Sequence, residues 1–107
     1  MTTFNDRERG FEAKFANDEE LKFKIMARRD RMLGEWVGAK LGLTGSELET
    51  YARSILKADL AEPGDEDVVR AVMADIDGKG VSLSPEDIRA KLNAFAAEAE
   101  TALRAGA

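Results

Sequence analysis

The chain has 107 residues and a net charge of −5, from 16 Lys and Arg against 21 Asp and Glu. This length suits one domain with one modest core. The chain contains neither Cys nor His, which excludes thiolate nucleophiles, disulfides, Cys/His zinc sites and imidazole bases. The net negative charge disfavours nucleic-acid binding, because that affinity depends on neutralising phosphates. No nucleophile–base pair, phosphate-binding loop or metal-ligand set stands out, so we expect no enzyme activity, no metal and no cofactor.

The N-terminus lacks the basic and apolar segments of a secretory signal. No apolar run approaches the ~20 residues that span a bilayer. We therefore expect a cytoplasmic protein without direct membrane insertion, and a monomer when free.

Apolar residues recur at three- and four-residue steps along most of the chain, which predicts helices. The predicted helices cover about residues 18–42, 45–60, 65–77 and 85–105. Asn17, Thr44 and Ser84 are the expected N-caps, and Gly42 is the expected left-handed residue at the end of the first helix. Amphipathic helices with short connections predict an all-α fold, a single four-helix bundle over residues 17–107.

Residues 1–16 do not continue the apolar stripe of the first helix. Phe4, Phe11 and Phe15 lie on one helical face, and polar residues at positions 18 and 22 separate this face from the stripe that begins at Ile25. A peptide this short does not hold a helix alone in water. We predict a mobile N-terminal arm, residues 1–16, that becomes helical on docking in a partner's groove. In the alternative, these Phe residues fold back on the bundle.

A basic patch follows the arm and comprises Lys22, Lys24, Arg28, Arg29 and Arg31. The first interpretation is a solvated helix face. The second is an anchoring surface for an acidic partner.

The segment from Asp75 to Glu86 nearly matches a calcium-binding EF-hand loop. Two residues argue against calcium. Lys79 stands where an oxygen ligand belongs, and Ser82 replaces the apolar residue at the eighth position. The end of one helix followed by a Ser-Pro-Glu helix start explains the same residues.

The N-terminal sequence resembles a known family. The run Phe4-Asn5-Asp6-Arg7-Glu8-Arg9 and the run from Phe11 to Glu20 are similar to the start of the ζ subunit, the inhibitor of alphaproteobacterial F-type ATP synthases. The similarity continues through Leu33-Gly34, Trp36, Tyr51-Ala52 and the run from Gly64 to Arg70, and it covers nearly the whole chain. The sequence differs from the family pattern at Asn5, where Asp is usual, and at Gly10, where Ala is usual.

The resemblance implies a four-helix bundle and a mechanism. In this family the N-terminal segment inserts between catalytic subunits of the ATPase head and blocks rotation in the hydrolytic direction, while the bundle anchors it. The implied partners are the catalytic and rotor subunits, so the protein would be peripheral to the inner membrane when bound. The implied inhibitory residues are Phe4, Asn5, Asp6, Arg7, Glu8, Arg9, Phe11, Glu12, Lys14, Phe15 and Asn17. A generic helical adaptor or regulatory protein acting through the same arm is the alternative.

Overall fold

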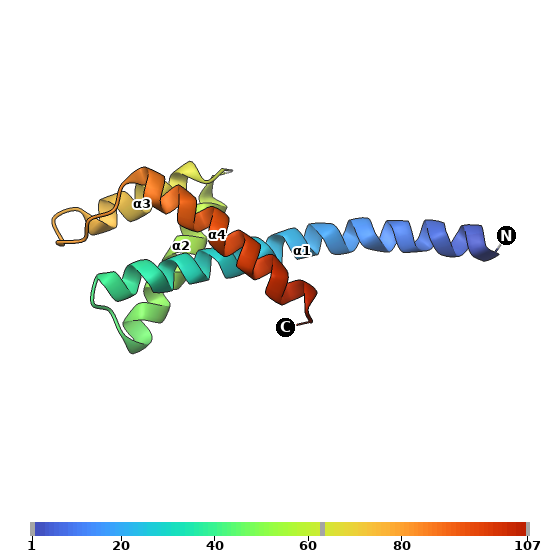
Figure 1. Ribbon diagram of the computed structural model, residues 1–107, viewed down its shortest axis with the longest axis horizontal. Coiled ribbons are helices and arrows are strands. Elements are labelled where there is room, and N and C mark those ends of the chain that lie inside the picture. Colours follow the sequence, from blue (N-terminus) through green and yellow to red (C-terminus); the bar gives the residue numbers. More distant parts are fainter. Residues whose placement is uncertain (1, 63, 107) are drawn as a thin grey trace.

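Four helices and no strand make up the described part of the chain (Figure 1). The computed structural model describes residues 2–62 and 64–106, and for residues 2–18 it describes the backbone but not the side chains. The helices are α1 (Thr2–Lys40), α2 (Gly45–Ala61), α3 (Glu66–Ile76) and α4 (Pro85–Arg104). The all-α, four-helix fold predicted from the sequence is confirmed.

Helix α1 begins at Thr2, whereas the sequence predicts a start near residue 18. The helix passes through Asn17, so the expected N-cap there is wrong. The physical reason is that no residue of α1 stops a helix: it contains no proline, and Gly10 costs only about 1 kcal/mol relative to Ala. The first part of α1 extends well beyond the other helices (Figure 1), and the molecule measures 65 × 26 × 21 Å. The division into arm and bundle at residue 16 stays a prediction.

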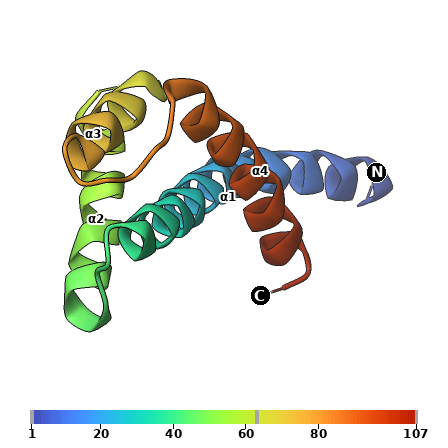
Figure 2. The ribbon, with the colours of Figure 1, turned by 60° about the vertical axis from the view of Figure 1, so that its left-hand side comes forward.

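The core lies where α1 and α3 each pack against both α2 and α4 (Figure 2). Each helix contributes its predicted apolar stripe. The buried hydrophobic residues are Leu33, Val37, Ala52, Ile55, Val68, Val69, Val72, Ile76, Ile88, Leu92 and Ala99. Trp36 and Phe95 are partly buried against this core and pack edge to face, with ring centroids 6.4 Å apart. Trp36 is therefore part of the core packing.

The helix ends follow from specific residues. Gly42 has a φ of +83°, and the amides of Gly42 and Leu43 donate to the carbonyls of Ala39 and Gly38, which satisfies the last carbonyls of α1. At the start of α4, Ser84 and Asp87 form a reciprocal capping box, with Pro85 in the first helical turn. Thr44 precedes α2 with extended backbone, but its side chain makes no capping hydrogen bond, so that detail of the sequence prediction is wrong.

Gly34 allows α1 and α2 to approach closely. A Cβ atom at this position would lie 2.5 Å from the backbone Cα of Ala52. A Cβ at Gly38, one turn later, would lie 2.5 Å from Leu48 Cδ1, the end of a flexible side chain that can move. The absence of a side chain therefore matters most at Gly34, because backbone atoms cannot give way without separating the helices.

We expect Gly34→Ala to destabilise the protein by about 1–2 kcal/mol. Overpacking typically costs about 1–3 kcal/mol, and the higher helix propensity of Ala offsets up to about 1 kcal/mol. Gly38→Ala is the matched control, and it should lower the stability by less than Gly34→Ala or raise it. Urea unfolding followed by circular dichroism measures both. Equal effects of the two substitutions would contradict the assigned contact.

Candidate partner-binding surface

The arm residues expected to contact a partner lie on the projecting part of α1 (Figure 1). The side chains between Phe4 and Asn17 lie outside the described residues. The backbone there is helical, so positions 4, 11 and 15 share one face of α1. The structure therefore gives the register of the arm, and its contacts stay a prediction.

The basic patch divides into two groups. Lys22, Lys24, Arg28 and Arg31 are exposed on α1. Arg29 is turned inward, and its side chain is only 11% exposed. Arg29 is therefore not available for the anchoring surface, because its guanidinium already binds carboxylates of the same chain.

A groove of about 920 Å³ lies beside the exposed basic residues. Helices α1, α2 and α4 form its walls. One aromatic ring, Phe23, is 51% exposed, and for a large apolar side chain this exposure is unusual in the described part of the fold. The groove is lined by Phe23, Lys24, Ala27, Arg28, Arg31, Met32, Glu35, Glu49, Ala52, Arg53, Leu56, Glu98, Ala102 and Leu103. It thus combines an apolar floor with charged residues, as surfaces that bind amphipathic helices do.

The charges along this groove are mostly paired within their own helix. Lys24 lies 3.3 Å from Glu20, Arg31 lies 3.6 Å from Glu35, and Arg53 lies 3.9 Å from Glu49. These are exposed pairs between residues four apart, each worth at most a few tenths of a kcal/mol. A partner's carboxylate can therefore displace them at little cost.

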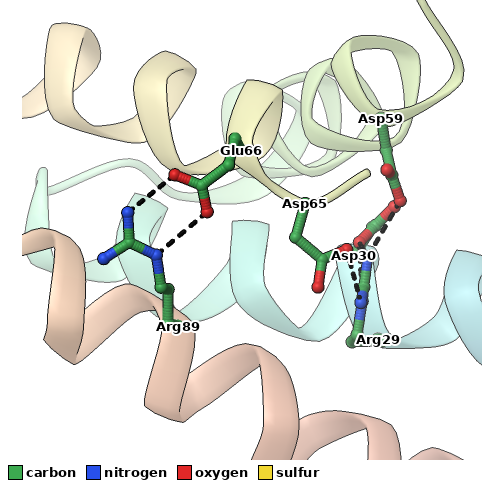
Figure 3. A network of polar contacts seen from close by, with 6 residues as sticks. All are labelled: Arg29, Asp30, Asp59, Asp65, Glu66 and Arg89. Carbon is green, nitrogen blue, oxygen red and sulfur yellow. Dashed lines mark hydrogen bonds and ion pairs between the residues drawn. The ribbon is translucent and has the colours of Figure 1, made fainter. Parts of the chain in front are cut away.

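A second feature, the carboxylate cluster, consists of Arg29, Asp30, Asp59 and Asp65 (Figure 3). The guanidinium of Arg29 donates from Nε to Asp30 Oδ1 at 3.1 Å and from Nη2 to Asp59 Oδ2 at 2.9 Å. It also donates from Nη1 to Asp65 Oδ1 at 3.1 Å. One cation thereby connects α1 to the end of α2 and to the residue that precedes α3. Burial lowers the pKa of Arg29, but the three carboxylates outweigh this and raise it overall.

Asp30 is completely buried, and Asp59 is 7% exposed. Burial, together with a hydrogen bond to Asp59, raises the pKa of Asp30 to about 8. The opposing attraction of Arg29 is smaller. Oδ2 of Asp30 finds no hydrogen-bond donor among the described groups. A buried carboxylate oxygen without a donor is costly, so this oxygen is satisfied best when it carries a proton.

The segment resembling a calcium loop is engaged by other contacts. Tyr51 Oη donates to Asp75 Oδ2 at 2.9 Å, and burial together with this hydrogen bond raises the pKa of Tyr51. Arg89 donates to Glu86 at 2.8 Å and binds both oxygens of Glu66 at 2.6 and 2.9 Å (Figure 3). Among the described residues, no three acidic side chains are grouped as a metal would require.

We expect calcium to leave this segment unchanged. The carboxylates of Asp75 and Glu86 already accept hydrogen bonds, and Lys79 places a positive charge inside the loop. Titration of calcium at constant ionic strength, with backbone amide signals of residues 75–86 as the readout, measures this directly. A saturable response at micromolar calcium would contradict it.

The buried acids Asp30 and Asp59 were not predicted from the sequence. A signal was present, because each lies on the apolar stripe of its helix. Asp30 is three residues before Leu33, and Asp59 is four residues after Ile55. A charged residue at a core position of each of two packed helices is a reason to expect a buried polar contact.

The fold and these surfaces define a small all-α protein that presents one long projecting helix beside a partly apolar groove lined by charges of both signs. The chain belongs to the family of ATPase inhibitor subunit zeta, whose sequence profile matches residues 1–102. This family consists of ATPase inhibitors, which are regulatory rather than catalytic proteins, and the resemblance noted from the N-terminal sequence is confirmed.

The chain is also similar to a protein whose structure was solved by solution NMR. The TM-score is 0.70 at 39% sequence identity, and the match covers 81% of this chain and 99% of that one. No curated protein sequence matches the chain. In the described part of the chain, none of the helices has the length and apolar character needed to cross a bilayer.

Proposed function

We propose that this protein inhibits ATP hydrolysis by an F-type ATP synthase through insertion of its N-terminal arm between catalytic subunits of the head. In the inserted position the arm blocks rotation in the hydrolytic direction. The partners are the catalytic and rotor subunits. The protein acts in the cytoplasm, peripheral to the inner membrane while it is bound.

The observation that carries the proposal is the continuity of α1. The helix has 39 residues, and its second half is packed into the core through Leu33 and Val37. At about 1.5 Å per residue, residues 2–17 span about 24 Å beyond the bundle. A helix that projects this far reaches into a crevice of a partner, and its fixed other end transmits the resisting force to the bundle.

The groove supports a second contact, in which the bundle holds the head while the arm is inserted. Arg28 and Arg31 line this groove on the same helix as the arm, and Lys24 lies one turn earlier. We assign the anchoring role to these exposed residues together with Lys22. Arg29, expected in this surface from the sequence, is left out because it is occupied inside the fold.

Affinity capture tests the proposal. The full-length chain, immobilised through a C-terminal tag, should capture the catalytic-head subunits from a lysate of its own organism. Arg28→Glu combined with Arg31→Glu should reduce this capture, because both charges line the groove. Lys79→Glu, a charge reversal in the loop between α3 and α4, is the matched control and should leave the capture unchanged. Capture of an unrelated protein without any head subunit would favour the adaptor alternative.

A further inference from the structure

We propose that the buried contact between Asp30 and Asp59, joined by Arg29, is a proton-controlled connection that regulates the direction of the N-terminal arm. The regulatory part of this inference rests on the proposed inhibitory function. The connection itself is a property of the fold and is tested separately.

The carboxylate cluster contains more negative than positive charge. Three carboxylates surround one guanidinium, and two of them, Asp30 and Asp59, are buried. With all three ionised, the cluster would carry a net charge of −2, and both carboxylates of the buried pair would be ionised out of reach of water. A proton shared by Asp30 and Asp59 halves this charge and supplies the donor that Oδ2 of Asp30 otherwise lacks.

The charged groups that face this pair come from each neighbouring element. Helix α1 supplies Arg29, and the residue before α3 supplies Asp65, whose side chain is 46% exposed. On α4, Arg89 binds Glu66 and Glu86 and not the buried pair; Figure 3 shows its contact with Glu66. Within the described residues no second cation contacts Asp30, so the proton is the remaining means of neutralising the pair. The rise of the pKa of Asp30 to about 8 agrees with this geometry.

The position of the pair on α1 gives it a regulatory consequence. Residues 22–24 and 28 are exposed, whereas Leu33 and Val37 are completely buried. Asp30 is therefore the first completely buried residue among the described side chains of α1, at the point where the helix enters the bundle. When Asp30 ionises, repulsion from Asp59 favours separation of α1 from the end of α2. The arm continues the same helix. A small change in the direction of α1 at Asp30 therefore displaces the far end of the arm by a larger distance.

The sign of the pH dependence follows from the raised pKa. In the unfolded chain Asp30 titrates near its ordinary value of about 4. Between about pH 4 and pH 8 the folded state holds one more proton than the unfolded state, so stability falls as the pH rises through this range. The stabilisation from the proton on Asp30 is complete below about pH 4 and is lost by about pH 8. Above that pH, Asp30 adds no further pH dependence to the stability.

Side-chain carboxyl NMR of the full-length protein tests the connection directly. We expect the Asp30 carboxyl to titrate with a midpoint near 8. Asp30→Asn is the matched variant, since its amide is neutral, has nearly the same shape, and can donate to Asp59 while accepting from Arg29. Between pH 5 and pH 8, the unfolding constant of the wild type should rise about tenfold per pH unit relative to the variant. An Asp30 carboxyl that stays ionised from pH 5 to pH 9, or parallel stability profiles, would overturn the inference.

Inhibition of the soluble catalytic head tests the regulatory part. The ratio of inhibition constants for the wild type and Asp30→Asn, taken at pH 6.5 and pH 8.5, removes the pH dependence of the ATPase itself. We expect the wild type to weaken at least fivefold relative to the variant at the higher pH. An unchanged ratio would refute regulation while leaving inhibition intact. Absence of inhibition by both proteins at both values would instead contradict the proposed function, and the carboxyl titration would still decide the connection.

Discussion

Replacing Phe11 and Phe15 together with Ala is expected to weaken inhibition of the cognate ATPase by about 30- to 1000-fold. Aromatic anchors at the centre of an interface typically contribute about 2–4 kcal/mol when they are buried. Both positions share one face of α1 on its projecting part. The melting temperature should change little if, as we predict, these rings lie on an arm outside the bundle; among the described side chains of α1, residues 19–40, burial begins at Asp30.

The matched control for this variant is Leu60→Ala. Leu60 is a large apolar residue that is 57% exposed, but it lies near the end of α2, outside the groove. It should leave inhibition unchanged. Gly10→Ala should strengthen inhibition by up to about fivefold, since the bound helix becomes up to about 1 kcal/mol easier to form. Steady-state ATP hydrolysis at several inhibitor concentrations measures all three proteins, and a double variant as potent as the wild type would argue against the arm.

Arg29→Ala should cost about 3–5 kcal/mol of stability at neutral pH. The substitution leaves Asp59 and Asp65 without the cation that binds both, and removing one partner of a buried ion pair has an effect of this size. Small domains have only about 5–15 kcal/mol in total.

Arg89→Ala is the control for this stability measurement. Arg89 makes a similar set of bonds, to Glu66 and Glu86, but these groups are exposed, so its removal should cost much less stability than removal of Arg29. Urea unfolding at 25 °C compares the two variants. Equal losses would contradict the importance of burial in the carboxylate cluster.

Much of the fold could be predicted from the sequence, because the spacing of apolar residues and the residues that begin and end helices indicate the same helices. The Val68–Ile76 stripe predicts α3, and the Ser-Pro-Glu start predicts α4 and its capping box. The extent of α1 was not predicted. The break in apolar periodicity at residues 18–22 predicts a helix start there, but periodicity shows what a helix packs against and not where its backbone begins or ends.

The surface was predicted less completely than the fold. The spacing of the basic residues places them on α1, but it does not show that Arg29 points inward while Arg28 and Arg31 line the groove. That distinction depends on Asp59 and Asp65, which are 30 and 36 residues away in the chain. Contacts of such long range become apparent only once α1 and α2 are placed side by side.

The most direct test of the arm's role compares the full-length protein with a chain that begins at Asn17, in an assay of ATP hydrolysis by the soluble catalytic head of the same organism. The shorter chain retains all the buried residues that the structure describes, so circular dichroism should show the same unfolding temperature for its bundle. We expect inhibition by the full-length protein and none by the shorter chain. Equal inhibition by both chains, or no inhibition by the full-length protein under any nucleotide condition, would contradict it.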